Sequence, residues 1–132
     1  MESSSITQGN QNDVDPLLQE LVLLVEKQDG EIALTLLTRG LVVFGILISG
    51  KKFFDGLIEG MPDNQVRTKF IDQRERHQNI VERVDTAEEL VYVHLKNAQF
   101  PGTLSVPKEN ITFWRVKIGE VDGFSVGFPL VD

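Results

Sequence analysis

The 132-residue sequence contains no cysteine, which excludes a disulfide framework and any metal site built on thiolates. It also has only two histidines, His77 and His94, and they lie too far apart in sequence to form a metal-ligand motif. The sequence therefore predicts neither a metal site nor a cofactor.

Long apolar runs are missing as well. The N-terminal stretch MESSSITQGNQND has neither the basic region nor the apolar core of a secretory signal, so we expect a cytoplasmic protein. The most apolar segment, residues 41–48, is separated from the apolar residues before it by Arg39 and Gly40. A membrane-spanning helix needs about 20 apolar residues, so no membrane association is predicted.

Positive charge is in short supply. The formal net charge is -7, and residues 1–31 contribute seven acidic residues against one basic residue, Lys27. Nucleic-acid-binding proteins usually present a basic face that neutralises phosphates. This charge balance makes a nucleic-acid partner an unfavoured interpretation.

The stretch GILISGKK, residues 45–52, has the form of a nucleotide-binding P-loop up to its last position. There Lys52 replaces the Ser or Thr that would bind Mg²⁺. Ile46, Leu47 and Ile48 are stiff strand residues, whereas a P-loop requires a flexible turn around the phosphates. The segment is therefore interpreted as a strand end, a glycine turn and the basic start of a helix.

The first elements are marked by clear boundary residues. Asp15 and Pro16 predict the start of a helix, and Gly30 is expected to end it in a left-handed conformation. Two strands follow, joined by a tight turn at Arg39-Gly40. Gly45 in the second strand indicates a bend or a close approach of another backbone.

A helical insertion is predicted over residues 51–86. It comprises a short helix after Lys51 and a very polar helix within residues 62–85, on which His77 is expected to be solvated. Three strand patterns follow, at residues 90–100, 111–121 and 124–128, with a loop between the first two. Asp122-Gly123 is expected to form a two-residue hairpin turn.

This order predicts an α+β fold. An N-terminal helix precedes a strongly bent five-stranded antiparallel sheet or a small Sm-like barrel, and the helical insertion lies between strands 2 and 3. Residues 1–12 are predicted to be a disordered tail, and residues 13–132 a single domain.

Candidate catalytic residues do not emerge. Ser49, Ser105 and Ser125 lack the surroundings of a nucleophile elbow, and the carboxylates are scattered, so no enzyme activity is predicted. The candidate partner-binding residues lie on the later strands. Trp114 and Arg115 are residue types that often anchor interfaces, and Trp114 either faces a partner or lies covered beneath the helices. His94 and Lys96 are expected on one polar strand surface.

Several segments resemble the gas-vesicle accessory proteins of the GvpU type. They are LISGKKFFDGL before and within the insertion, then HLKNAQF and ITFWRVKIGEVDGFSVG, covering roughly residues 30–60 and 90–128. The resemblance implies a small cytoplasmic protein, distinct from the vesicle shell protein, without enzyme activity or cofactor. It further implies partners among the shell or other accessory proteins.

Two functional hypotheses result. The first is a non-enzymatic accessory protein that acts through protein contacts in vesicle formation or clustering. Self-association is expected with it, because the strand LVVFGILIS is apolar on both faces and needs covering. The alternative is an Sm-like oligomeric nucleic-acid-binding protein, which salt-sensitive RNA binding would reveal.

Overall fold

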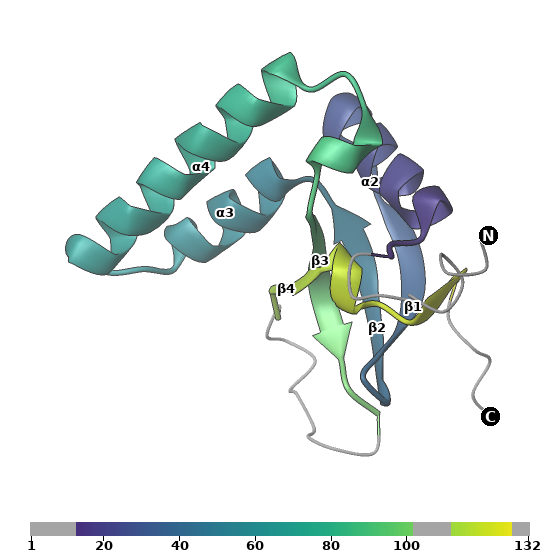
Figure 1. Cartoon of the computed structure of the whole chain (residues 1–132). Helices are drawn as coiled ribbons and strands as arrows, with labels where there is room; N and C mark the ends of the chain where they lie inside the picture. Colours follow the sequence, from purple (N-terminus) through teal and green to yellow (C-terminus); the bar gives the residue numbers. More distant parts are fainter. Residues whose placement is uncertain (1–12, 102–111, 128–132) are drawn as a thin grey trace.

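The structure is a computed structural model, and it describes residues 13–101 and 112–127. Figure 1 shows a sheet with one helix packed on it and a pair of helices extending to the side. In chain order the elements are α2 (Pro16–Gln28), β1 (Ile32–Thr38), β2 (Leu41–Ile48), α3 (Gly50–Glu59), α4 (Gln65–Arg83), the 3-10 turn η1 (Ala87–Glu89), β3 (Tyr92–Gln99), β4 (Trp114–Lys117), the 3-10 turn η2 (Ile118–Glu120) and β5 (Gly123–Val126). The predicted tail (residues 1–12), all but the first residue of the predicted loop, residue 111 and residues 128–132 lie outside the described residues.

Helix α2 begins as predicted. The Asp15 side chain accepts hydrogen bonds from the amides of Leu17 and Leu18, which have no partner within the helix. The predicted end at Gly30 was wrong by one residue, because Asp29 adopts the left-handed conformation, with φ 55°. Aspartate tolerates this conformation better than most residues do.

The hairpin of β1 and β2 is confirmed. Arg39 and Gly40 have φ of 52° and 81°, the positive values that a two-residue turn between twisted strands requires. Thr38 and Leu41 pair directly beside the turn. Asp122 Oδ2 accepts a hydrogen bond from the Arg39 amide, so the turn is also tied to the C-terminal part of the chain.

The sheet is antiparallel and has five strands in the order β4-β3-β2-β1-β5. The predicted α+β class and the position of the helical insertion are confirmed. The Sm-like barrel was wrong, because the sheet does not close.

The predicted hairpin at Asp122-Gly123 was also wrong, since β4 and β5 lie at opposite edges of the sheet. Ile118 and Val121, in the segment between them, are buried in the main core. The amide of Asp122 donates to the carbonyl of Leu37 over 2.7 Å. Because these apolar side chains are buried, the segment between β4 and β5 crosses the core, and the two strands do not form a hairpin.

A β-bulge lies where the sequence indicated a close backbone approach. The pairing of β2 with β3 shifts between Phe44 and Ile46, and Asn97 on β3 has a φ of 54°. A Cβ atom on Gly45 would lie 3.2 Å from Leu95 Cβ. Glycine at this point lets the two strands approach.

Two apolar cores lie on opposite faces of the sheet. The larger one joins α2 to alternate strand residues, among them Leu34, Val43 and Leu95. The smaller one contains Ile48 from β2 and Phe53, Phe54 and Ile58 from α3. The helical insertion therefore covers part of the face that α2 leaves open.

The α3–α4 pair runs away from the sheet and returns to it (Figure 1). Its two helices pack through Phe54, Phe70 and Ile71, among others. In the described part of the chain, no helix combines the length and apolar character needed to cross a membrane.

Gly56 on α3 gives a test of this packing. A Cβ atom at Gly56 would overlap the ring of Phe113, which lies just before β4. Overpacking costs about 1–3 kcal/mol, whereas the gain in helix propensity from Gly to Ala is about 1 kcal/mol. We expect Gly56→Ala to lower the free energy of unfolding, measured by urea denaturation, by about 1 kcal/mol.

The matched control is Gly60→Ala at the exposed end of the same helix. Nothing lies within 4 Å of a Cβ built there, so its unfolding free energy should be unchanged or slightly higher. Equal effects of the two substitutions would contradict the contact between Gly56 and Phe113.

Candidate functional site

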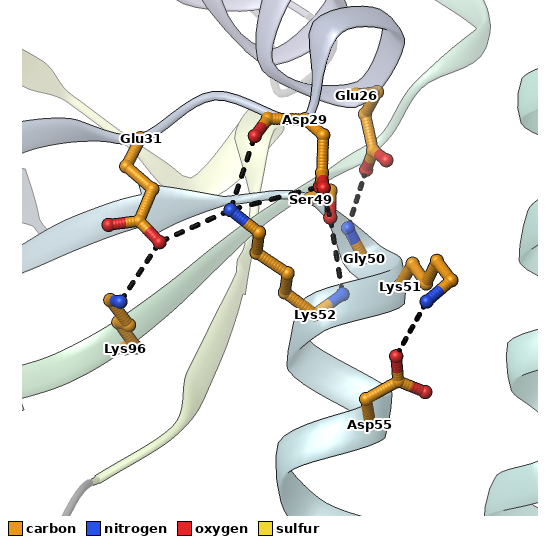
Figure 2. A network of polar contacts seen from close by, with 9 residues as sticks. All are labelled: Glu26, Asp29, Glu31, Ser49, Gly50, Lys51, Lys52, Asp55 and Lys96. Carbon is orange, nitrogen blue, oxygen red and sulfur yellow. Dashed lines mark hydrogen bonds and ion pairs between the residues drawn. The ribbon is translucent and has the colours of Figure 1, made fainter.

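The P-loop-like segment forms the start of helix α3. The Ser49 hydroxyl accepts a hydrogen bond from the amide of Lys52 over 3.1 Å and donates to Asp29 over 3.0 Å (Figure 2). Ser49 is thus the N-cap of the helix.

A carboxylate of the protein itself occupies the helix N-terminus. Glu26 Oε2, from α2, accepts a hydrogen bond from the amide of Gly50 over 3.0 Å (Figure 2). The positive end of a helix dipole is where a P-loop would place phosphate. Glu26 takes that place here, in agreement with the interpretation of the segment as structural.

Lys52 and Lys96 share the carboxylate of Glu31. Their ammonium groups lie 3.2 Å and 2.9 Å from Glu31 Oε2, and Lys52 also donates to the carbonyl of Asp29 (Figure 2). The hydrogen bond from Lys96 is the main reason that the pKa of Glu31 is lowered. Lys96 therefore links β3 to the start of β1, and each such partly exposed pair contributes about 0–1 kcal/mol.

His94 is buried, so its predicted place on an exposed strand surface was wrong. Only 2% of the residue is exposed. The rings of Phe53 and Phe54 cover it, with centroids 4.8 Å and 6.1 Å from the imidazole. The strand alternation was interpreted correctly, but α3 packs on the face that was expected to be polar.

His77 was expected in solvent, and this too was wrong. Its Nε2 lies 2.9 Å from Glu26 Oε2, and 15% of its side chain is exposed. The His77 ring lies 5.4 Å from that of His94. A Cβ atom on Gly50 would overlap the His77 ring, so glycine at this position makes room for the imidazole.

Arg115 and Trp114 are adjacent on β4, but their side chains have different surroundings. The Arg115 guanidinium stacks on the Tyr92 ring, 3.7 Å from its centroid, and Arg115 pairs with the buried His94 across β3 and β4. Trp114 remains 45% exposed and meets the edge of Phe100, with ring centroids 5.0 Å apart. The four predicted partner-binding residues therefore do not form one exposed surface. They are His94, Lys96, Trp114 and Arg115.

The polar groups around His77 and His94 act within the chain through hydrogen bonds and ion pairs. Among the described residues, no group of three or more His, Cys, Asp or Glu side chains could hold a metal ion. The hydroxyl of Ser49, the N-cap of α3, is engaged by Asp29 and by the amide of Lys52.

The sequence analysis did not predict that Glu26, Asp29 and Glu31 bind the start of α3 and the lysines Lys52 and Lys96. They come from α2 and the turn after it, whereas their partners lie about 20 or more residues later in the chain. At Gly50 the sequence indicated only a glycine turn before a helix, and it gave no indication of the imidazole that lies beside this glycine.

The fold and its polar network define a small α+β protein with an open sheet and a side-mounted helix pair. A family model described as gas vesicle protein GvpU-like matches residues 15–129, which is most of the chain. The chain therefore belongs to the GvpU-like family of gas vesicle proteins. No curated protein and no solved structure gives a significant match.

Burial of His94 predicts a pH dependence of stability. Desolvation, followed by the nearby His77 and Arg115, lowers the pKa of His94 from 6.5 to about 3. Between these two values the unfolded chain binds a proton at His94 and the folded protein does not, so stability falls as the pH decreases. The contribution of this group is at most about 1.4 kcal/mol per pH unit.

We expect His94→Phe to reduce the loss of stability between about pH 6 and pH 4, measured by urea denaturation at each pH. The aromatic contacts with Phe53 and Phe54 should remain, and the buried polar atoms are removed. An unchanged pH profile in this variant would show that His94 does not contribute.

Proposed function

We propose that the protein is a non-enzymatic accessory protein of the gas-vesicle system and works in the cytoplasm. It acts through contacts with the shell or with other accessory proteins in vesicle formation or clustering. Membership of the GvpU-like family implies association with gas vesicles and supports this role.

The observation that carries the proposed contact surface is the exposure of Trp114. This large aromatic residue lies on β4, an edge strand of the sheet, with 45% of its area exposed. Tryptophan is enriched among the residues that dominate binding energy, and an edge strand offers backbone groups to a partner. Phe100 supports one side of the ring.

Co-flotation tests this surface. Purified protein is mixed with purified gas vesicles, the vesicles are floated by centrifugation, and both layers are assayed. We expect wild-type protein in the floating layer and a shift of Trp114→Ala to the lower layer, because a hot-spot truncation weakens binding by about 2 kcal/mol or more.

The matched control is Val126→Ala. Val126 is 63% exposed on β5, at the opposite edge of the sheet, and its truncation should leave flotation unchanged. Circular dichroism confirms that both variants are folded. Wild-type protein that stays wholly in the lower layer would contradict the vesicle contact.

Self-association is the second part of the proposal. The helices cover much of β2, which was expected to be apolar on both faces: Val43 and Leu47 pack in the larger core and Ile48 in the smaller one. Beyond them, Leu37 and Val42 pair across β1 and β2 and are 42% and 37% exposed. This pair is the surface through which we expect copies of the chain to meet.

Sedimentation velocity tests the self-association. We expect an oligomer for the wild type and a smaller species for Val42→Lys, because a buried, unpaired ammonium is unfavourable in an interface. Val66→Lys, at a 55% exposed position on α4, is the control and should sediment as the wild type. A monomeric wild type would overturn this part of the proposal and leave the vesicle contact untouched.

A further inference from the structure

A hollow of about 660 Å³ lies where the start of α2 meets the 3-10 turns η1 and η2. Its wall is apolar at Val14, Leu90, Val91 and Ile118, and Gln19 contributes an amide. Ligand sites in proteins usually have volumes of about 300–1,000 Å³ and an apolar wall with a few polar groups. The hollow therefore has the size and the lining of a site for a small molecule.

Gln19 is the buried polar group of this hollow. It lies on the side of α2 that carries the core residues Leu18 and Val22, and only 7% of it is exposed. Its backbone amide bonds to the carbonyl of Asp15, whereas its side chain has no hydrogen-bond partner among the described residues. Buried amides in native proteins are almost always paired, so a molecule in the hollow is expected to supply the partner.

The side-chain amide of Gln19 is open to such a molecule. In the described part of the chain, the unpartnered side-chain polar atoms that are closed to water belong to His94 alone. The oxygen and nitrogen of the Gln19 side chain also lack a partner, but they are not closed to water, and the residue lines the hollow. These two atoms are therefore within reach of a ligand.

The charges at the rim of the hollow cancel. Glu120 is paired with Arg39 from the turn between β1 and β2. Glu88 and Lys117 contribute one charge of each sign, and both are exposed, so that solvent and salt screen them. The rim thus favours an ion of neither sign, and recognition depends on hydrogen bonding and apolar contact.

The amide of Gln19 selects the kind of ligand. A carboxamide has an acceptor oxygen next to an NH₂ donor. A second primary carboxamide matches this pair, because its own oxygen and NH₂ group face the complementary atoms and two parallel hydrogen bonds form. A ligand that has only an acceptor can form one of these two bonds.

We propose that this hollow binds a small, uncharged molecule that carries a primary carboxamide on an apolar body, with Gln19 as its polar contact. Leu90 and Ile118 receive the apolar body, and the Gln19 amide sets its orientation. Trp114 is not among the residues that line the hollow, so the site stands or falls independently of the proposed vesicle contact.

Benzamide is a suitable probe, because it is uncharged and joins a primary carboxamide to one apolar ring. The full-length protein, labelled with ¹⁵N, is titrated with benzamide, and the side-chain NH₂ signal of Gln19 is followed by NMR together with the backbone amides. We expect saturable shifts at Gln19, Val91 and Gly119 with a Kd of about 1–10 mM, the range for so few atoms.

A modified ligand and a pair of glutamine variants test the role of the amide. N,N-dimethylbenzamide keeps the acceptor but lacks the donors, and it should bind about tenfold more weakly, as expected for a lost hydrogen bond. Gln19→Leu should weaken the binding of benzamide at least as much. The matched control is Gln28→Leu, at an exposed position on the same helix outside the hollow, which should bind benzamide as the wild type does.

Two tryptophan variants test the position of the ligand. Val91→Trp, at a 57% exposed position on the wall, should fill the hollow and abolish saturable binding without altering the core. Val126→Trp, at a 63% exposed position on β5 outside the hollow, should leave binding unchanged.

Absence of saturable shifts in the wild type would overturn the proposal and leave water as the partner of Gln19. Equal binding of benzamide and N,N-dimethylbenzamide would also overturn it, because the hollow would then recognise the ring alone. Should Gln19→Leu fail to fold, the two ligands and the pair Val91→Trp and Val126→Trp still decide whether a carboxamide binds in this hollow.

Discussion

The Glu26 carboxylate is the contact on which the arrangement of the helices depends. It is carried by α2, accepts from the first amide of α3 and lies beside His77 of α4. A single buried group thus joins three helices that are separate in the sequence. Its side chain is only 2% exposed, and a buried carboxylate must be well paired to be tolerated.

Packing of later parts of the chain explains why α3 contains glycines. The His77 ring needs the space beside Gly50, and the Phe113 ring needs the space beside Gly56. The two rings come from elements that follow α3 in the chain, so each glycine accommodates a later part of the fold. With His77 and α3 in place, the sheet face that carries His94 is covered.

Sequence reasoning succeeded where the information is local. The cap at Asp15 and the turn at Arg39-Gly40 depend on neighbouring residues and are confirmed. It failed where a distant element decides the outcome. Alternation placed His94 on one face of β3, but only the packing of α3 makes that face an interior, and the Asp122-Gly123 turn pattern was overridden by burial of Ile118 and Val121.

The same distinction separates the residues that hold the fold from those available to a partner. Arg115, predicted from residue type, and Lys96, predicted from its strand face, are engaged by Tyr92 and Glu31 within the chain. Trp114 rests against Phe100 yet leaves nearly half of its area exposed. The part of Trp114 that folding leaves exposed is apolar area that a partner could still remove from water, and the hydrophobic effect scales with that area. This remaining area is the reason for proposing the β4 edge, and not Lys96 or Arg115, as the surface that a partner covers.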